Sequence, residues 1–259
     1  MYLTWLDSNT WLIEMGGKRI LVDPWLVGSL VFGNLDWLFK GSRSQDRSIP
    51  ENIDLIVLSQ GLEDHTHPAT LKQLDRKIPV VGSASAAKVV QELGFTSVTI
   101  LAHEQTFTLA QSMTIKAIPG SRVGPNLVEN GYLLKEIESG LTLYYEPHGS
   151  HSPSLKAEAP IDVVITPLLD LALPLIGPII KGNESALELA EWVQPQVILP
   201  TATPGDVVYA GFLLNLLHAV GSIEEFRSML ARHSLATRVV EPLPGDRFEL
   251  QLVRRVLAV

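Results

Sequence analysis

Short hydrophobic runs, separated by turn residues, follow one another from the first residue of the chain. Alternating apolar positions over residues 2–6, 11–15 and 18–22 predict three strands, and Gly16-Gly17 between the last two is typical of a tight hairpin turn. The apolar run at residues 53–57 predicts a further strand. Pro68 then suits the first turn of a helix, because its missing N–H would have no partner there.

Strands and helices alternate through the rest of the chain. Ser83 as a cap and Gly94 as a stop predict a helix over residues 83–93, and the capping box Ser222-x-x-Glu225 predicts another that ends at Arg232. Further strands are predicted at residues 79–81, 97–101, 106–109, 113–118, 131–135, 141–145, 161–165, 197–199, 237–240 and 248–252, and further helices at 183–193 and 212–220. Apolar strands in both halves, with helices between them, favour two sheets packed face to face with helices outside.

Two segments, residues 25–39 and 168–180, are too apolar for solvated loops and follow neither helical nor strand periodicity. Such a segment either packs on its own core, which we favour, or lines a pocket for an apolar ligand or forms a surface for a protein partner. Trp25 and Trp37 are the candidate pocket residues of the first segment. We expect the two segments to flank the same cleft.

Composition narrows the class of protein. A chain of 259 residues with 46% hydrophobic and 19% charged residues can bury a large core, and no linker divides it, so we expect one domain over residues 1–259. A formal charge of -8 with scattered Lys and Arg argues against nucleic acid as a partner. No cysteine is present, which excludes thiolate ligands and nucleophiles. The N-terminus lacks the pattern of a signal peptide, and no apolar run reaches the ~18 residues of a membrane span, so a cytoplasmic protein is expected.

Carboxylate and imidazole groups gather after two of the predicted strands. Asp64, His65 and His67 lie in the polar loop between the strand at residues 53–57 and the helix that starts at Pro68. Glu146, His148 and His151 follow the strand at residues 141–145 in the same way. Polar groups at the ends of two strands predict a functional site at one edge of the sandwich.

The loop after residue 57 resembles the signature of the metallo-β-lactamase superfamily, His-x-His-x-Asp-His, which here reads Gln60-Gly61-Leu62-Glu63-Asp64-His65. The opening hairpin and Asp23-Pro24 resemble the ascorbate-6-phosphate lactonase-like branch of that superfamily, and the loops at residues 59–65 and 144–148 look similar to its cyanobacterial and plastid type. The resemblance implies the superfamily's α/β fold, a four-layer αβ/βα sandwich.

The resemblance also implies a reduced metal site. Gln60, Leu62 and Arg122 stand where the family places ligands of its first metal, and Ala202 stands where it places the last histidine. Asp64 and His65 match ligands of the second metal, with His148 in place of the bridging carboxylate. We therefore expect at most one zinc or iron ion at Asp64, His65 and His148, and no dinuclear centre. Further candidate residues are Glu146, His67, His151 and Asp23 as a fourth ligand or a hydrogen-bond partner of the ligands, and Gln60 and Arg122 as pocket residues.

Three functions stay open at this level. The first is a metal-dependent hydrolase of this fold, with Asp64 and His65 as catalytic residues, acting on a small molecule, for which an apolar one is a candidate. The second is a metal-free binding or scaffold protein that uses the same cleft, in which case Asp64 and His65 are structural and Asp23 only stabilises a turn. The third is an iron-dependent oxygen chemistry at the same three residues.

Overall fold

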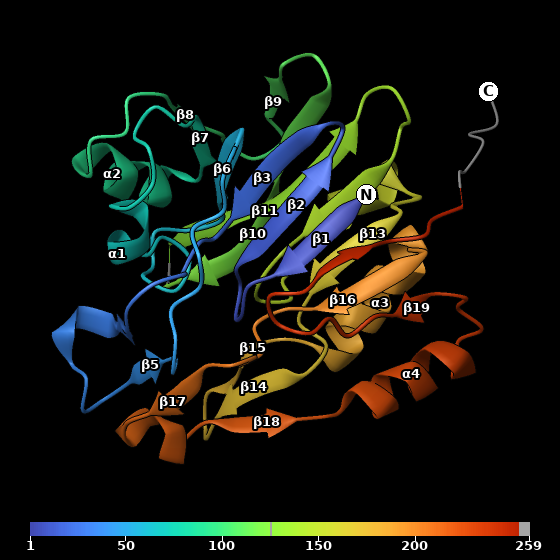
Figure 1. The fold of residues 1–259 in the computed structure, drawn as a ribbon. Coiled ribbons are helices and arrows are strands. Elements are labelled where there is room, and N and C mark those ends of the chain that lie inside the picture. Colours follow the sequence, from blue (N-terminus) through green and yellow to red (C-terminus); the bar gives the residue numbers. More distant parts are fainter. Residues whose placement is uncertain (125, 254–259) are drawn as a thin grey trace.

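The computed structural model describes residues 1–124 and 126–253, and its architecture is four-layered (Figure 1). Two seven-stranded sheets pack face to face, and each carries helices on its outer side. The predicted α/β sandwich is confirmed.

The first sheet has the order β20-β1-β2-β3-β6-β7-β8. Its strands are β1 (Tyr2–Trp5), β2 (Trp11–Met15), β3 (Lys18–Val22), β6 (Leu55–Leu58), β7 (Val80–Gly82), β8 (Val98–Ile100) and β20 (Arg247–Glu249). Strands β3, β6, β7 and β8 are parallel, so their carboxyl ends lie at one edge of the sheet. Helices α1 (Pro68–Leu71) and α2 (Ala84–Glu92) cover its outer face through the apolar side chains Leu71, Ala86 and Val90.

The second sheet has the order β19-β16-β13-β12-β11-β10-β9. Its strands are β9 (Thr106–Leu109), β10 (Met113–Val123), β11 (Leu127–Glu136), β12 (Thr142–Tyr145), β13 (Val163–Thr166), β16 (Val197–Pro200) and β19 (Arg238–Val239). Its outer face is covered by α3 (Asn183–Val193), α4 (Ile223–Arg232) and the 3₁₀ helix η2 (Pro153–Glu158).

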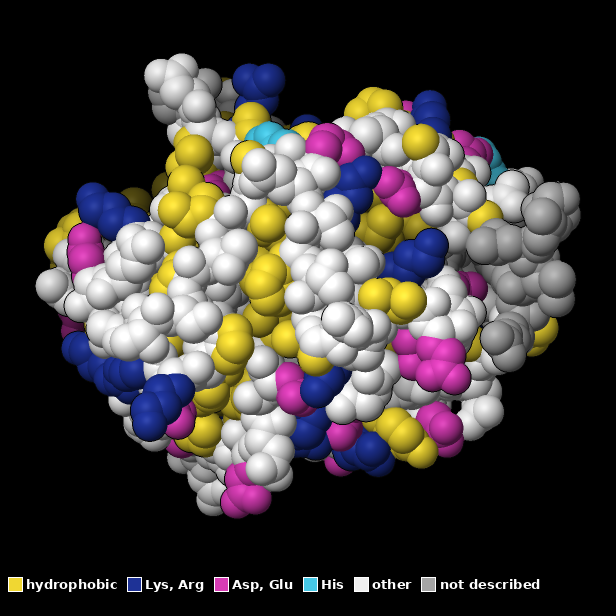
Figure 2. Space-filling model, turned by 90° about the horizontal axis from the view of Figure 1, so that it is seen from above, with side chains coloured by type: hydrophobic (Ala, Val, Ile, Leu, Met, Phe, Trp, Pro, Cys, Tyr) yellow, Lys and Arg dark blue, Asp and Glu magenta, His cyan; other side chains and the backbone are white. Residues whose placement is uncertain are grey.

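The main core lies between the two sheets because alternate residues of each strand point inward. Ile13, Ile20 and Val57 from the first sheet meet Ile115 and Ile165 from the second, and all five side chains are fully buried. On the face shown in Figure 2, basic and acidic side chains are interspersed. No helix among the described residues is long and apolar enough to cross a membrane.

Two small sheets lie outside the sandwich and contain the two apolar segments. One has the order β17-β5-β4, with β4 (Leu30–Val31), β5 (Lys40–Ser42) and β17 (Val208–Ala210); η1 (Phe32–Asn34) follows β4. The other has the order β15-β14-β18, with β14 (Asp170–Leu173), β15 (Gly177–Ile180) and β18 (His218–Val220). Figure 1 shows both at the lower end of the molecule.

The helix predicted over residues 212–220 is wrong. The segment contains a short 3₁₀ helix, η3 (Phe212–Asn215), followed by β18, which pairs with β14. Its apolar side chains face outward rather than into the core, and Phe212 is 55% exposed. An apolar run without a core to pack on does not form a long helix, because burial of one face normally stabilises such a helix.

A buried ion-pair cluster joins three distant segments near the N-terminus. Asp7 is fully buried and accepts hydrogen bonds from Arg43 Nε at 2.8 Å and from Arg47 Nε and Nη2 at 2.9 and 3.0 Å. Arg43 also lies over the Trp25 ring, with Cζ 4.2 Å from its centroid, and donates from Nη2 to the Trp25 carbonyl at 2.7 Å. The backbone N–H of Asp206 completes the shell around Asp7 at 2.8 Å.

Candidate metal centre

The candidate site lies where β3, β6 and β12 end at the same edge of the sandwich. Asp23 directly follows β3, the loop with Asp64 and His65 follows β6, and His148 follows β12. The loop after β6 is held by its own backbone, because His65 N–H and Thr66 N–H donate to the Leu62 carbonyl at 3.0 and 2.8 Å. Because β3 and β6 pair in parallel, their carboxyl ends lie side by side, and this brings Asp23 close to the loop with Asp64 and His65.

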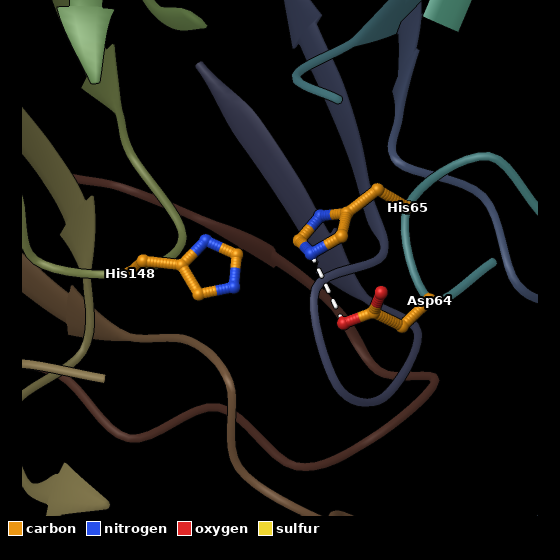
Figure 3. A group of neighbouring side chains, drawn as sticks. All are labelled: Asp64, His65 and His148. Carbon is orange, nitrogen blue, oxygen red and sulfur yellow. Dashed lines mark ion pairs between the residues drawn. The ribbon is translucent and has the colours of Figure 1, made fainter. Parts of the chain in front are cut away.

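Asp64, His65 and His148 form one group, as predicted from the sequence. One ligand atom of each residue can be chosen so that all three lie within 4.8 Å of one another. His65 Nε2 is 3.0 Å from Asp64 Oδ2, and the centroids of the two imidazole rings are 5.0 Å apart. In Figure 3 the two imidazoles face each other across a short gap, with Asp64 beside them. Two imidazoles and a carboxylate are a donor set that suits zinc and iron(II).

Asp23 orients His65 from behind. Its fully buried carboxylate accepts the Nδ1–H of His65 at 2.7 Å, which leaves Nε2 directed at Asp64. The same carboxylate accepts from Ser59 N–H at 2.7 Å and from the Tyr145 hydroxyl at 2.6 Å. Metal-binding histidines usually donate their second N–H to such an acceptor, which fixes ring orientation and tautomer. Asp23 is thus a hydrogen-bond partner of the triad and not a member of it.

His148 is held by two polar side chains. Ser121 Oγ and Gln60 Nε2 each lie 3.3 Å from its Nδ1. The Ser121 hydroxyl can accept a hydrogen bond from Nδ1–H, which would leave the lone pair of Nε2 available for a ligand. Glu146 fixes the loop itself, since one of its oxygens, Oε2, accepts from the N–H groups of His148 at 3.1 Å and Ser150 at 2.8 Å.

The charges of the group are strongly coupled. Burial opposes a charged His65, but the carboxylates of Asp64 and Asp23 outweigh it and raise the pKa of His65 to about 10. Burial would likewise raise the pKa of Asp64, yet His65 and His148 lower it. Burial, together with the charge on His65, lowers the pKa of His148 to about 4. The negative charges of Asp64 and Asp23 are thus balanced by a proton on His65, and a bound cation could take the place of that proton.

Buried oxygen atoms without a hydrogen-bond partner concentrate in this region. In residues 1–124 and 126–253, four buried polar side-chain atoms lack a partner, and three are oxygen acceptors: Gln60 Oε1, Asp64 Oδ1 and Glu146 Oε1. Unpaired buried acceptors are costly, and a cation satisfies them better than a neutral group. The residues therefore fit a metal ion, both in donor chemistry and in these unpaired oxygens.

A family model described as the Beta-lactamase superfamily domain matches residues 2–202. The chain belongs to the metallo-β-lactamase superfamily. Solved structures with the same fold include an isothiocyanate hydrolase from Delia radicum gut bacteria, with a TM-score of 0.69, 18% identity, and coverage of 96% of this chain and 99% of that chain.

Two further solved structures with this fold are of metal-dependent enzymes. A metallo hydrolase from the archaeon Ignicoccus hospitalis has a TM-score of 0.65 and 18% identity, and the match covers 96% of this chain and 99% of that chain. A diiron β-hydroxylase from Streptomyces venezuelae also has a TM-score of 0.65 and 18% identity, but the match covers 98% of this chain and only 54% of that chain. At this level of identity, the likeness concerns the fold alone.

Two of the residues considered as further ligands of this metallo-β-lactamase site point elsewhere. His67 caps α1, with Nδ1 3.4 Å from Thr70 N, and its Nε2 lies 3.3 Å from the Ser29 carbonyl. His151 lies between Tyr144 and Thr166 on the helix side of the second sheet, at 3.4 Å from each hydroxyl, and burial lowers its pKa to about 3. Both histidines have partners outside the triad, so the structure does not bring either of them to it.

The proposed pocket residues do not share one environment. Trp25 is fully buried beside Arg43 and His67, whereas Trp37 is 65% exposed. Arg122 is exposed, and its neighbour Ser121 is the residue of β10 that contacts His148. A cavity of about 1270 Å³ lies beside the start of α3 and along α4, and no residue of the triad lines it. Of the four predicted pocket residues, only Gln60 contacts the triad among the described interactions.

Sequence reasoning missed three residues of the site. Ser59 and Tyr145 bind Asp23, and Ser121 binds His148. Ser59 and Tyr145 each stand at the end of a strand that leads into the site, which is a usable signal. Ser121 follows an irregularity in the pairing of β10 with β11 between Pro119 and Arg122, and this shift of side-chain direction has no clear mark in the sequence.

Proposed function

We propose that the chain is a metal-dependent hydrolase with a single ion held by Asp64, His65 and His148. The observation that carries the proposal is the convergence of these three ligand atoms within 4.8 Å, next to buried oxygens that lack partners. The reduced motif supports one ion rather than two, because Leu62 has no donor atom and is 39% exposed. We also propose that residues 1–259 form one domain, and that the chain is related to the ascorbate-6-phosphate lactonase-like branch.

Each residue of the site would have a distinct task in hydrolysis. A bound ion would lower the pKa of its water and polarise the bond under attack. Asp23 holds His65 in the orientation that directs Nε2 into the site, while Ser121 holds His148. Glu146, whose pKa burial raises to about 7, keeps the loop before His148 in place through backbone N–H groups. Asp64 would be the carboxylate ligand of the ion.

A second candidate is a binding protein for an apolar molecule or partner. It is favoured by side chains of the small sheets and their loops that remain exposed: Trp37 is 65% exposed, Phe212 is 55% exposed, and Ile176 is 74% exposed. The segments that contain Trp37 and Phe212 are joined through their backbones, because Phe212 N–H donates to the Trp37 carbonyl at 3.0 Å. In this candidate the triad would be structural, and no metal would be required.

Metal content distinguishes the two candidates. We expect the wild type, purified without added metal, to hold about one equivalent of zinc or iron by elemental analysis, and His148→Ala and Asp64→Ala to lose it. His233→Ala is the matched control, because His233 is an exposed histidine that pairs with Glu191 at 2.7 Å. A wild type that binds no zinc or iron even after dialysis against either ion would contradict the proposal and favour the second candidate. Two equivalents of tightly bound metal would contradict the single-ion site.

A further inference from the structure

Gln60 lies beside His148 and directly follows Ser59, which contacts the other histidine of the triad. Its neighbour Ser59 has Oγ 3.2 Å from His65 Nδ1, and Gln60 Nε2 lies 3.3 and 3.5 Å from Nδ1 and Nε2 of His148. The side chain is only 1% exposed, so the amide is enclosed in the site and not directed at bulk water. Its backbone is fixed as well, since the Gln60 carbonyl accepts from Thr66 Oγ at 2.5 Å.

The amide oxygen of Gln60 has no partner. Oε1 is one of the three unpaired buried acceptors, and it belongs to the same amide group that contacts His148. A buried amide oxygen that lacks a donor costs free energy, and a metal ion offers it a positive charge that the surrounding side chains do not. Amide oxygens are recognised ligands of metal ions in proteins.

We propose that Gln60 supplies a fourth protein ligand through Oε1, so that the ion is bound by two imidazoles, one carboxylate and one amide oxygen. This inference rests on the proposed single-ion site and adds a residue to it. The amide is neutral, so it adds a ligand without adding charge to Asp64, and this favours a divalent ion over a more highly charged one.

Neighbouring polar groups are less suited to that position. Glu146 uses Oε2 to hold the loop, and none of its oxygens belongs to the group of ligand atoms within 4.8 Å of one another. Asn9 lies beside His65, but its Nδ2 faces His65 Nε2 at 3.5 Å and its Oδ1 lies 3.5 Å from Thr201 Oγ. Gln60 therefore combines an unpaired oxygen with a contact to the imidazole of His148, whereas Glu146 contacts only the backbone of that residue among the described interactions.

The test compares three variants that separate coordination from support of His148. Gln60→Leu keeps the volume and removes the donor, and Gln60→Glu keeps an oxygen in the same position. Ser121→Ala is the matched control, since it removes the other side chain that lies 3.3 Å from His148 Nδ1 but offers no comparable ligand. Zinc affinity is measured by competition with a chelator, and Co²⁺ is substituted to record the visible absorption of the bound ion. Thermal unfolding of the metal-free proteins checks that each variant is folded.

We expect Gln60→Leu to bind zinc about tenfold or more weakly than the wild type and to change the Co²⁺ absorption, while Gln60→Glu binds at least as tightly as the wild type. Ser121→Ala should change the Co²⁺ absorption less than Gln60→Leu does, because it removes a hydrogen-bond partner of His148 and no ligand. Equal losses in Gln60→Leu and Ser121→Ala with unchanged absorption would overturn the inference, because Gln60 would then only support His148. If the wild type itself binds neither ion, the proposed function fails; if it binds and Gln60→Leu is indistinguishable from it, only this inference fails.

Discussion

Two buried carboxylates, Asp7 and Asp23, occupy similar positions and have different chemistry. Each follows a strand end, is fully buried and has a positive φ, 75° for Asp7 and 43° for Asp23. Asp7 is surrounded by Arg43, Arg47 and a backbone N–H, whose charges do not change with pH. Asp23 is surrounded by two hydroxyls, a backbone N–H and the imidazole of His65, whose protonation can change.

The difference shows how a functional carboxylate can be told from a structural one. Around Asp7 both carboxylate oxygens accept from guanidinium groups and a backbone N–H, so neither is left unpaired, and the atom without a partner there, among the described residues, is a donor, Arg43 Nη1. Around Asp23 the hydrogen bonds lead to His65 and from there to Asp64, whose Oδ1 is unpaired. Burial alone does not distinguish the two sites, but the identity of the partners does.

The largest expected effect is the loss of stability when Asp7 is neutralised. Asp7→Asn would remove the carboxylate charge that Arg43 and Arg47 share, and Arg43 would be left buried without a counter-charge, which should cost about 3 to 5 kcal/mol of unfolding free energy. Asp206→Asn is the control, since its side chain is 60% exposed and pairs only with Arg47 at the surface, so it should cost about 0 to 1 kcal/mol. Denaturant titrations of both variants measure the loss of unfolding free energy. Equal losses in the two variants would contradict the view that the buried carboxylate holds the cluster together.

A similar loss is expected at Trp25, whose ring supports Arg43 in the same cluster. Trp25→Ala removes a fully buried indole and should cost about 3 to 5 kcal/mol. Trp37→Ala, from the same apolar segment, should change stability by no more than about 0.5 kcal/mol because the side chain is 65% exposed. A large loss at Trp37 in thermal melts would mean that the exposed end of the segment is also part of the core.

At the other carboxylate, the expected effect is on metal binding. Asp23→Asn keeps the volume but replaces the acceptor of His65 Nδ1–H, and we expect zinc affinity to fall about 10- to 100-fold. Asp162→Asn is the control. Asp162 lies directly before β13 and outside the triad, and its buried carboxylate accepts from the Thr142 hydroxyl. If Asp23→Asn loses stability but keeps its zinc affinity, Asp23 is a structural carboxylate like Asp7 and does not support the metal site.

The smallest expected effect is a difference in acid sensitivity. Burial would raise the pKa of Asp7, but hydrogen bonds from Arg47 and Arg43 outweigh it and keep the pKa below its ordinary value of 3.8. A carboxylate with a lowered pKa in the folded state stabilises the protein fully above its unfolded pKa, and this contribution is lost as the pH falls through the folded pKa. The stability gap between wild type and Asp7→Asn should therefore be constant near neutral pH and narrow below about pH 4. If the stability difference already narrows near pH 6, a group other than Asp7 is responsible for its pH dependence.

The fold and the centre of the site were predictable because both depend on local patterns. Strand periodicity located most strands, and the polar loops after β6 and β12, matched to the superfamily's motif, brought Asp64, His65 and His148 into one prediction. Their role as ligands stays a prediction, as does that of Gln60. The partners of Asp7 were not predictable, because Arg43 and Arg47 lie in a segment without periodicity and reach Asp7 only through tertiary packing.

Other errors have physical causes of the same kind. His67 and His151 were considered as ligands because they stand close to the motif in sequence, but His67 caps a helix and His151 faces the opposite side of its sheet. Trp25 and Trp37 were grouped because they share an apolar segment, yet one is in the core and the other at the surface. Proximity along the chain could not show on which side of a sheet each residue would lie.

The last fifth of the chain contributes one strand to each of the four sheets. After residue 202, where the family match ends, β17 joins the small sheet of the N-terminal half and β18 joins that of the C-terminal half. β19 then borders the second large sheet, and β20 pairs with β1 at the border of the first. A chain cut at residue 202 would keep every residue of the triad but lose an edge strand from each of the four sheets. Such a fragment would expose unpaired strand edges to other molecules, so self-association, rather than a smaller working version of the protein, is its expected fate.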